Sequence, residues 1–278
     1  TKILQGKLIF AIGYSEPNSG TDLASLKTKA IKEKDGYLIN GQKMWTSLAN
    51  FSDYIWLATR TDFEVKNHKG ISIFIVPTDD QGFSMSEINT LGDVRTNATF
   101  YDNILVPDSY LVGKLNEGWS LITNQLNLER LALVNHGPVE ELYNNVLSLA
   151  HQTKINKDQY LTDISWVKHN LAQVYSGIEA LKLICWKQTW IMESDKLNMA
   201  EASVAKVYGS EFFIEAYRLL MEIMGELSLL KNESELSILN AKLERMYRTA
   251  SILTFGGGTN EVQRDIIAMA GLLMPRTR

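Results

Sequence analysis

Two short blocks near the start of the chain combine hydroxyl, aromatic and turn-forming residues, as ligand-binding loops do. The first, residues 11–22, reads AIGYSEPNSGTD and leads from a short apolar strand into a loop rich in backbone donors. The second, NGQKMWTS, starts at Asn40 and includes Trp45. Such loops can place donors where negative charge accumulates on a ligand, beside an apolar wall that excludes water. Taken alone, the first block is explained as well by a surface turn.

A third candidate is the carboxylate of Glu129 in the segment LNLERLAL, where it directly precedes Arg130. Its neighbours in sequence are apolar: Leu126, Leu128, Leu131 and Leu133. Burial among apolar groups raises the pKa of a carboxyl group toward neutral pH, as a general base requires. Most helical glutamates are solvated surface residues, and that interpretation stays open for Glu129.

The fourth candidate is the glycine-rich turn in TFGGGTNEVQR, which includes Gly257 and precedes a helical pattern. Glycines allow main-chain N–H groups to approach a ligand oxygen closely. Thr259 and Glu261 occupy the start of the following helix, where anions are readily bound. A purely structural role for the turn is the alternative.

The composition of the chain limits the partners and cofactors that these residues can bind. The chain has 278 residues, a net charge of −4 and no dense basic tract, so nucleic acid is not expected as a partner. The single cysteine, Cys185, cannot form an intramolecular disulfide, and four histidines give no metal-ligand spacing. Apolar runs are far shorter than a membrane span requires. We therefore expect a cytoplasmic protein without a structural metal and without a membrane partner.

The first part of the chain, up to Pro107, has short runs rich in β-branched and aromatic residues, separated by Gly and Asp turn signals. This pattern predicts an antiparallel β-domain, barrel-like or with orthogonal sheets, over residues 1–108. Within it, YLINGQKMW is the clearest hairpin candidate, because Asn40-Gly41 suits a tight two-residue turn.

Beyond Pro107 the apolar period becomes helical. The clearest apolar stripe consists of Ile164, Val167, Leu171, Val174, Ile178, Leu181 and Cys185. Similar patterns cover residues 117–150, with a kink expected at Gly137-Pro138, and residues 200–230, 236–253 and 260–272. The chain is thus predicted to be α+β, with an up-and-down four-helix bundle over residues 109–278 after the β-domain.

The two loop blocks, LNLERLAL and GGGTNEVQRDIIAMAG, in this order, resemble the acyl-CoA dehydrogenase family over most of the chain. The resemblance implies FAD as cofactor and an acyl-CoA thioester as substrate. It implies flavin contacts, with Trp45 packed along the ring, from these residues: Ile12, Tyr14, Ser15, Trp45, Thr46, Ser47, Thr259 and Glu261. It places Thr21 near the CoA end of the substrate.

The same resemblance implies the reaction. A carboxylate removes the proton α to the thioester carbonyl while a hydride leaves the β-carbon for flavin N5, and an electron-transferring flavoprotein reoxidises the flavin. Many members carry the base at the position of Gly257, whereas a minority carry it on a helix directly before an arginine. Glu129 is therefore the expected base, Gly257 adjoins the thioester oxygen, and Arg130 holds local structure or the substrate's polar end.

Some family features are altered. The motifs with which a neighbouring subunit binds FAD are not intact, and Glu222 and Glu226 would bring negative charge toward a phosphate. This pattern resembles heterotetrameric dehydrogenases of steroid side chains. We therefore expect a homo- or hetero-oligomer with a related subunit, and a bulky or branched acyl chain in the substrate. The family's N-terminal helical domain has no counterpart, which predicts a truncated or degenerate subunit. A catalytically silent partner subunit and another flavin oxidase or monooxygenase are the rival hypotheses.

Overall fold

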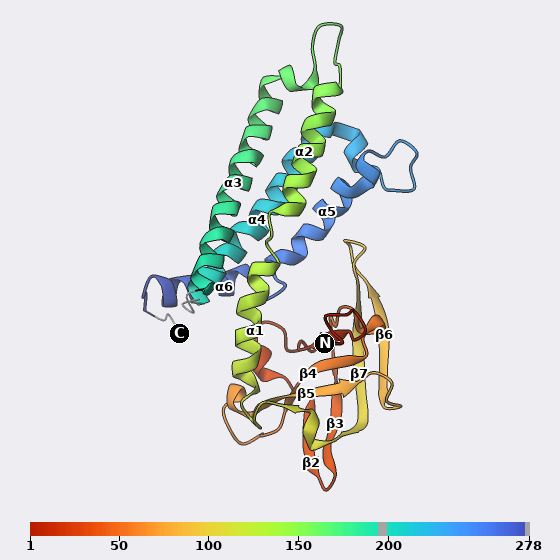
Figure 1. The fold of residues 1–278 in the computed structure, drawn as a ribbon, viewed down its shortest axis with the longest axis vertical. Coiled ribbons are helices and arrows are strands. Elements are labelled where there is room, and N and C mark those ends of the chain that lie inside the picture. The colour runs from red at the N-terminus through yellow and green to blue at the C-terminus, as the bar shows by residue number, and fades with distance from the viewer. Residues whose placement is uncertain (194–198, 276–278) are drawn as a thin grey trace. The chain divides into compact units, whose positions relative to one another are not determined.

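A computed structural model describes residues 1–193 and 199–275 (Figure 1). The chain divides into two compact units, Thr1–Gln125 and Leu126–Arg278. The first unit is built on a sheet and the second on helices, and each is described by itself. Helix α1 (Gly118–Ala132) contains the boundary between the two units.

The first unit contains one eight-stranded sheet. Its strands are β1 (Phe10–Gly13), β2 (Lys29–Glu33), β3 (Gly36–Lys43), β4 (Tyr54–Arg60), β5 (Ile71–Pro77), β6 (Phe83–Asn89), β7 (Arg95–Val106) and β8 (Leu111–Val112). Their order is β6-β7-β3-β2-β4-β5-β8, with β1 paired to β4 beside this path. The sheet is open, with β6 and β8 at the ends of the path.

The predicted α+β class is confirmed, and the sheet proves to be mixed rather than wholly antiparallel. β1 pairs with β4 in parallel, with Phe10 opposite Tyr54 and Gly13 opposite Leu57. Parallel neighbours need a long crossover, and the β2–β3 hairpin lies within the connection between these two strands. Most of the first block and all of the second lie within this connection.

The predicted hairpin at Asn40-Gly41 is wrong. β3 continues through both residues and pairs with β7, with a register shift between Ile39 and Gly41. Asn40 instead exchanges side-chain hydrogen bonds with Asn103, whose φ is 52°. The tight turn lies one strand earlier, between Glu33 and Gly36, which are paired across β2 and β3. An Asn-Gly pair is thus used here for an irregularity within a strand.

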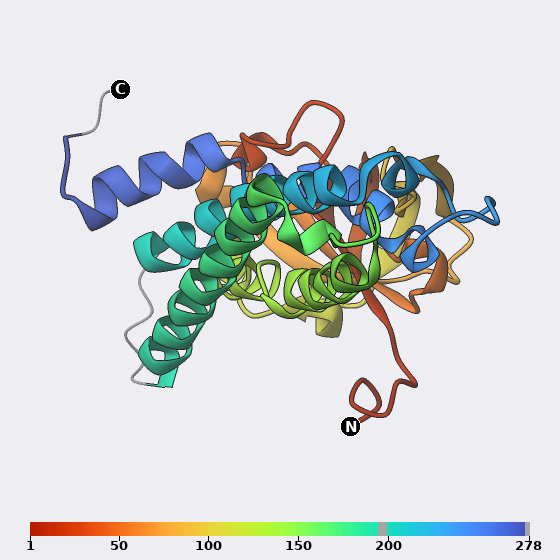
Figure 2. The same cartoon turned by 90° about the horizontal axis from the view of Figure 1, so that it is seen from above.

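The second unit is helical. Its helices after α1 are α2 (Gly137–Gln152), α3 (Ser165–Glu193), α4 (Met199–Met224), α5 (Lys242–Ala250) and α6 (Asn260–Ile266), which a short π-helix (Ile267–Gly271) follows. Consecutive helices pack on each other from α2 to α5, and α6 packs on α4 (Figures 1 and 2).

The apolar stripe predicted for α3 forms the centre of this bundle. Five of its residues are buried: Val167, Leu171, Val174, Ile178 and Leu181. They share one hydrophobic cluster with buried residues of α2, α4 and α5, including Leu142, Tyr217 and Leu243. The kink predicted at Gly137-Pro138 is a complete break, because α1 ends at Ala132 and α2 begins at Gly137. Within the described residues, no helix is both long and apolar enough to cross a membrane.

Candidate functional site

The first block forms the end of β1 and the loop that follows it. The Tyr14 carbonyl accepts a hydrogen bond from Lys43 Nζ at 3.0 Å, and the Ser15 carbonyl accepts one from the Met44 amide at 2.8 Å. The Ser15 amide and hydroxyl donate to no group among the described residues. The two blocks are therefore held together by donors of the second block and carbonyls of the first, while Ser15 keeps two donors for a ligand.

The hydroxyl group of Tyr14 is already engaged. The side chain is 7% exposed, and its oxygen accepts a hydrogen bond from Trp56 Nε1 at 3.0 Å and donates one to Gln125 Oε1. Ile12, two residues earlier on β1, has its side chain 38% exposed. Thr21 lies farther along the loop and is also exposed. Ile12, Tyr14, Ser15 and Thr21 are the four predicted ligand contacts in this block. Of these, Tyr14 alone has a side chain that is fully engaged within the protein.

Trp45 lies in a strained loop between β3 and β4. Its φ is 64°, that of Leu48 is 66°, and both side chains are more than half exposed. A bulky residue in the left-handed region is uncommon and persists only where its surroundings enforce it. Here Asn97 enforces it, because its carbonyl accepts from the Thr46 amide at 2.9 Å and its Nδ2 donates to the Thr46 carbonyl at 3.1 Å. The loop thus presents a large aromatic surface to solvent at the expense of backbone strain.

Thr46 and Ser47, the next two residues, point to different environments. Thr46 is fully buried, and its hydroxyl lies 3.3 Å from that of Thr99. Ser47 is exposed and its hydroxyl donates to Thr96 Oγ1 at 3.3 Å. Thr46 therefore anchors the loop, and Ser47 has the hydroxyl that a ligand can reach.

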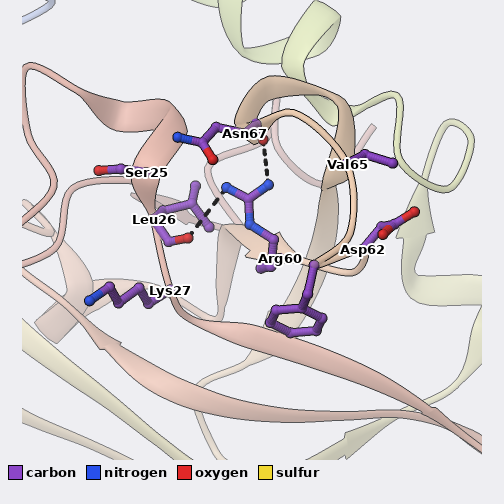
Figure 3. Close-up of a pocket in the computed structure, with 8 residues that line it drawn as sticks. Ser25, Leu26, Lys27, Arg60, Asp62, Val65 and Asn67 are labelled. Atoms are coloured by element: carbon purple, nitrogen blue, oxygen red, sulfur yellow. Dashed lines mark hydrogen bonds between the residues drawn. The ribbon is translucent and has the colours of Figure 1, made fainter.

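A pocket of about 380 Å³ lies in the same unit, where the loop that follows the first block meets the loop after β4 (Figure 3). Arg60 lies at its centre, donating to the backbone carbonyls of Asn67, Ala24 and Leu26. Burial lowers the pKa of Arg60, although nearby carboxylates oppose this. Lys27 adds an exposed ammonium group at the rim. The pocket therefore combines two cationic groups and the Asp62 carboxylate with an apolar wall of Leu26, Phe63 and Val65.

In the second unit, Glu129 and Arg130 lie near the end of α1. Burial raises the pKa of Glu129, and the positive charge of Arg130 opposes the shift. Arg130 is 7% exposed and donates to Asn127 Oδ1 at 2.7 Å and to the Gly257 carbonyl at 3.4 Å. Leu128 is 45% exposed, and the side chain of Leu131 lies outside the described part of the chain. Glu129 is thus partly desolvated, while the guanidinium is directed to the glycine-rich turn.

The glycine-rich turn is supported from α4 by a fully buried lysine. Lys206 Nζ donates to the Gly258 carbonyl at 2.6 Å and to Asn260 Oδ1 at 2.8 Å. Asn260 in turn donates to Ser210 and to Glu211 at 3.0 and 3.1 Å. Gly257 adopts a φ of 70°, and its amide donates to no described residue. The turn is held by its carbonyls, and this N–H remains available.

Thr259 and Glu261 occupy different environments at the start of α6. Thr259 caps the helix, because its hydroxyl accepts a hydrogen bond from the Val262 amide at 3.3 Å. Such caps stabilise helices by about 1 kcal/mol. Glu261 is exposed in the first turn. Thr259 therefore has a structural function that is sufficient to explain it.

The negative charge expected from Glu222 is largely compensated within the chain. Glu222 accepts hydrogen bonds from Arg218 and, at 3.2 Å, from Asn170. Glu226 lies in the short 3₁₀ segment after α4 and is exposed. Repulsion of a phosphate by this region is therefore weaker than the sequence indicates.

Sequence reasoning missed two buried lysines, although both left a signal. Lys43 follows Tyr37 and Ile39 on the inward face of β3, and Lys206 lies on the stripe of Ala202 and Gly209 along α4. A lysine at an inward position needs acceptors, since buried charges are paired. A search for cations that interrupt apolar stripes would have identified both.

Comparison with known proteins gives a consistent result over the whole chain. Residues 11–104 match the family model described as acyl-CoA dehydrogenase, middle domain, and residues 116–272 match the model described as acyl-CoA dehydrogenase, C-terminal domain. The acyl-CoA dehydrogenase FadE26 of Mycobacterium tuberculosis is 48% identical, with 99% of this chain and 70% of FadE26 covered. FadE29 of the same organism is 42% identical with the same coverage.

Solved structures agree in fold. The ChsE4-ChsE5 complex from Mycobacterium tuberculosis matches with a TM-score of 0.93 and 48% identity, over 99% of this chain and 71% of that one. A structure described as Tcur3481-Tcur3483 steroid ACAD matches with a TM-score of 0.94 and 45% identity, over the same shares of the two chains. Both descriptions name two components.

Proposed function

The chain belongs to the acyl-CoA dehydrogenase family, and from this premise we propose that it catalyses α,β-dehydrogenation of an acyl-CoA thioester with FAD as the electron acceptor. The observation that carries the proposal is the Glu129 carboxyl group, whose pKa burial raises within the family's C-terminal domain. A proton-abstracting base in this family must be partly desolvated, and Glu129 fulfils that condition.

FAD fits the chemistry of the first unit. The Ser15 amide and hydroxyl are free donors, and the exposed face of Trp45 supplies an aromatic surface held in a strained loop. Such strain concentrates at ligand sites. We assign Ile12, Tyr14, Ser15, Trp45, Thr46 and Ser47 to this cofactor wall, in which Tyr14 and Thr46 hold the two blocks in place. Bound FAD would supply the two-electron acceptor for the substrate hydride.

The residues of the second unit handle the proton and the thioester oxygen. Glu129 takes the proton from the α-carbon, and Arg130 holds the glycine-rich turn through the Gly257 carbonyl. The free amide of Gly257 then donates to the thioester oxygen, which stabilises the negative charge that develops as the proton leaves. Glu261 is left as a candidate contact to the cofactor at the start of α6.

Anaerobic addition of an acyl-CoA to the yellow FAD-bound protein tests the proposal. We expect the flavin absorbance band to bleach when a bulky acyl-CoA is added, because reduction requires both a bound flavin and an active base. A thioester without an α-hydrogen is the control and leaves the band unchanged. Persistence of the band across a panel of acyl-CoAs would favour another flavin reaction, and colourless protein would favour a silent subunit.

The substrate class and the assembly are further parts of the proposal. The steroid ACAD and the ChsE4-ChsE5 complex are described with two components each, so we propose a hetero-oligomer with a related subunit and a steroid-like or otherwise bulky acyl group. A relative from Acetobacterium woodii is described as a subunit of a caffeyl-CoA reductase-Etf complex. This supports an electron-transferring flavoprotein as the reoxidising partner, and a cytoplasmic location accords with both.

The pocket at Lys27 and Arg60 is proposed to receive the phosphate-bearing end of CoA, with Thr21 on the same loop. The Lys27→Ala variant should raise KM about two- to fivefold and leave kcat unchanged, because an exposed ammonium group contributes up to about 1 kcal/mol to anion binding. Steady-state kinetics at low and high salt measure this, and the difference should shrink as salt screens the charge.

Lys34→Ala is the matched control for this measurement, since Lys34 is an exposed lysine in the β2–β3 turn outside the pocket. Its KM should equal that of the wild type. An equal increase in KM for both variants would indicate a general charge effect and contradict the assignment of the pocket.

A further inference from the structure

Lys43 is a fully buried cation directly behind the proposed cofactor wall. It lies at the end of β3, and its Nζ donates to the Tyr14 carbonyl at 3.0 Å and to Glu16 Oε1 at 2.9 Å. Glu16 is 9% exposed and also accepts from the amides of Lys27 and Thr28 at 2.7 and 2.8 Å. The pair therefore connects β3, the first block and the start of β2.

The electrostatics of the pair favour a charged lysine. Burial works to raise the pKa of Glu16, but the charge of Lys43 and the hydrogen bonds from Lys43 and Thr28 outweigh it and lower the pKa. Burial lowers the pKa of Lys43 to about 8, because Glu16 offsets only part of the desolvation and Arg60 adds positive charge. At neutral pH both groups are ionised, so a positive charge faces the Tyr14 carbonyl.

Stability alone does not require a lysine at this position. Replacing a buried ion pair by apolar residues of similar volume is often neutral or stabilising. What an apolar residue cannot do is donate a charged hydrogen bond to the Tyr14 carbonyl. That carbonyl and the Ser15 amide belong to the same peptide group, so a proton donor on the carbonyl makes the amide a stronger donor.

We propose that Lys43 is a positioning residue that orients and polarises the Tyr14–Ser15 peptide, so that the Ser15 amide binds reduced flavin more tightly than oxidised flavin. The proposal rests on the proposed function, which places Ser15 at the cofactor. Reduction adds negative charge to the flavin, and a stronger donor stabilises the charged form preferentially. Lys43 thereby raises the flavin reduction potential without touching the flavin.

The test uses the oligomeric holoprotein reconstituted with FAD. Its readouts are the FAD dissociation constant, from flavin fluorescence, and the two-electron reduction potential. For Lys43→Met we expect about a tenfold loss of preference for reduced flavin, equivalent to a potential lower by about 30 mV. The double variant Glu16→Gln, Lys43→Met leaves no unpaired buried charge and should show the same decrease even if the single variant folds poorly.

Lys32→Met is the matched control, because it also removes an ion-paired lysine of the same unit, one whose partner, Asp108, lies at the surface. It should leave both the melting temperature and the flavin potential near their wild-type values. A wild-type potential in the double variant would overturn the role of Lys43 and leave the proposed function intact. Failure of the wild-type protein to bind FAD would overturn both.

Discussion

Glu129→Gln is expected to slow flavin reduction by an acyl-CoA by roughly 10²–10⁴-fold, while the protein keeps its yellow colour. Glutamine has nearly the same shape as glutamate but accepts no proton from the α-carbon. Anaerobic stopped-flow absorbance at the flavin band measures the rate directly. Because Glu129 is not among the residues assigned to the flavin, the FAD dissociation constant should change little.

The pH dependence gives a second measure of the same residue. Burial raises the pKa of Glu129, with Arg130 opposing, so the carboxylate is lost as pH falls through this raised value. The rate of reduction should therefore decline on the acidic side at a higher pH than an ordinary glutamate would give. If the rate instead declined at the pKa of an unperturbed glutamate, the result would count against Glu129 as the base.

Glu141→Gln is the control for both measurements. Glu141 is an exposed glutamate on α2 that pairs with Lys242 at 2.6 Å. Loss of this surface pair should change stability by less than about 1 kcal/mol and leave the rate of reduction unchanged. Full activity of Glu129→Gln in the same assay would remove Glu129 from the mechanism.

Lys206→Met is expected to lower the free energy of unfolding by about 2–4 kcal/mol, because two buried acceptors lose their donor. These acceptors are the Gly258 carbonyl and Asn260 Oδ1. The glycine-rich turn would lose its support from α4, so KM for the acyl-CoA should also rise. Urea denaturation measures the free energy, and steady-state kinetics measure KM.

Lys206 also predicts a pH dependence of stability. Burial and the positive charge of Arg130 lower its pKa to about 8, although Glu261 and Glu211 oppose the shift. Above pH 8 the folded state releases this proton while the unfolded state keeps it, so stability increases with pH from about 8 toward the unfolded value of about 10.4. The increase should be smaller in Lys206→Met than in the wild type.

Lys187→Met is the matched control, since Lys187 pairs with Glu201 at 3.0 Å on the exposed side of α3 and α4. It should lower the free energy of unfolding by less than about 1 kcal/mol. If Lys206→Met lowered the free energy of unfolding no more than Lys187→Met, the buried contacts of Lys206 would contribute little to stability.

The apolar patterns predicted the helical unit well, because one face of each long helix must be buried. The α3 stripe from Val167 to Leu181 lies in the bundle core. After Pro107 the two-residue strand β8 still belongs to the sheet, and the long helices begin with α1 at Gly118. The hairpin at Asn40-Gly41 failed because local turn preference is weak compared with continuous pairing along β7. The parallel pairing of β1 with β4 involves strands far apart in sequence, and no local pattern reports it.

The sequence by itself determined the family, the two blocks of the proposed cofactor wall and the carboxylate at Glu129, because motif residues and their order are local properties. Only the tertiary structure decided which of these groups are free to act. It engages the Tyr14 hydroxyl with Trp56 and Gln125 and leaves the Ser15 amide and hydroxyl unpartnered among the described residues. It also places Lys43 behind them. Hydrogen-bond partners come from strands distant in sequence, so their assignment depends on how those strands pack.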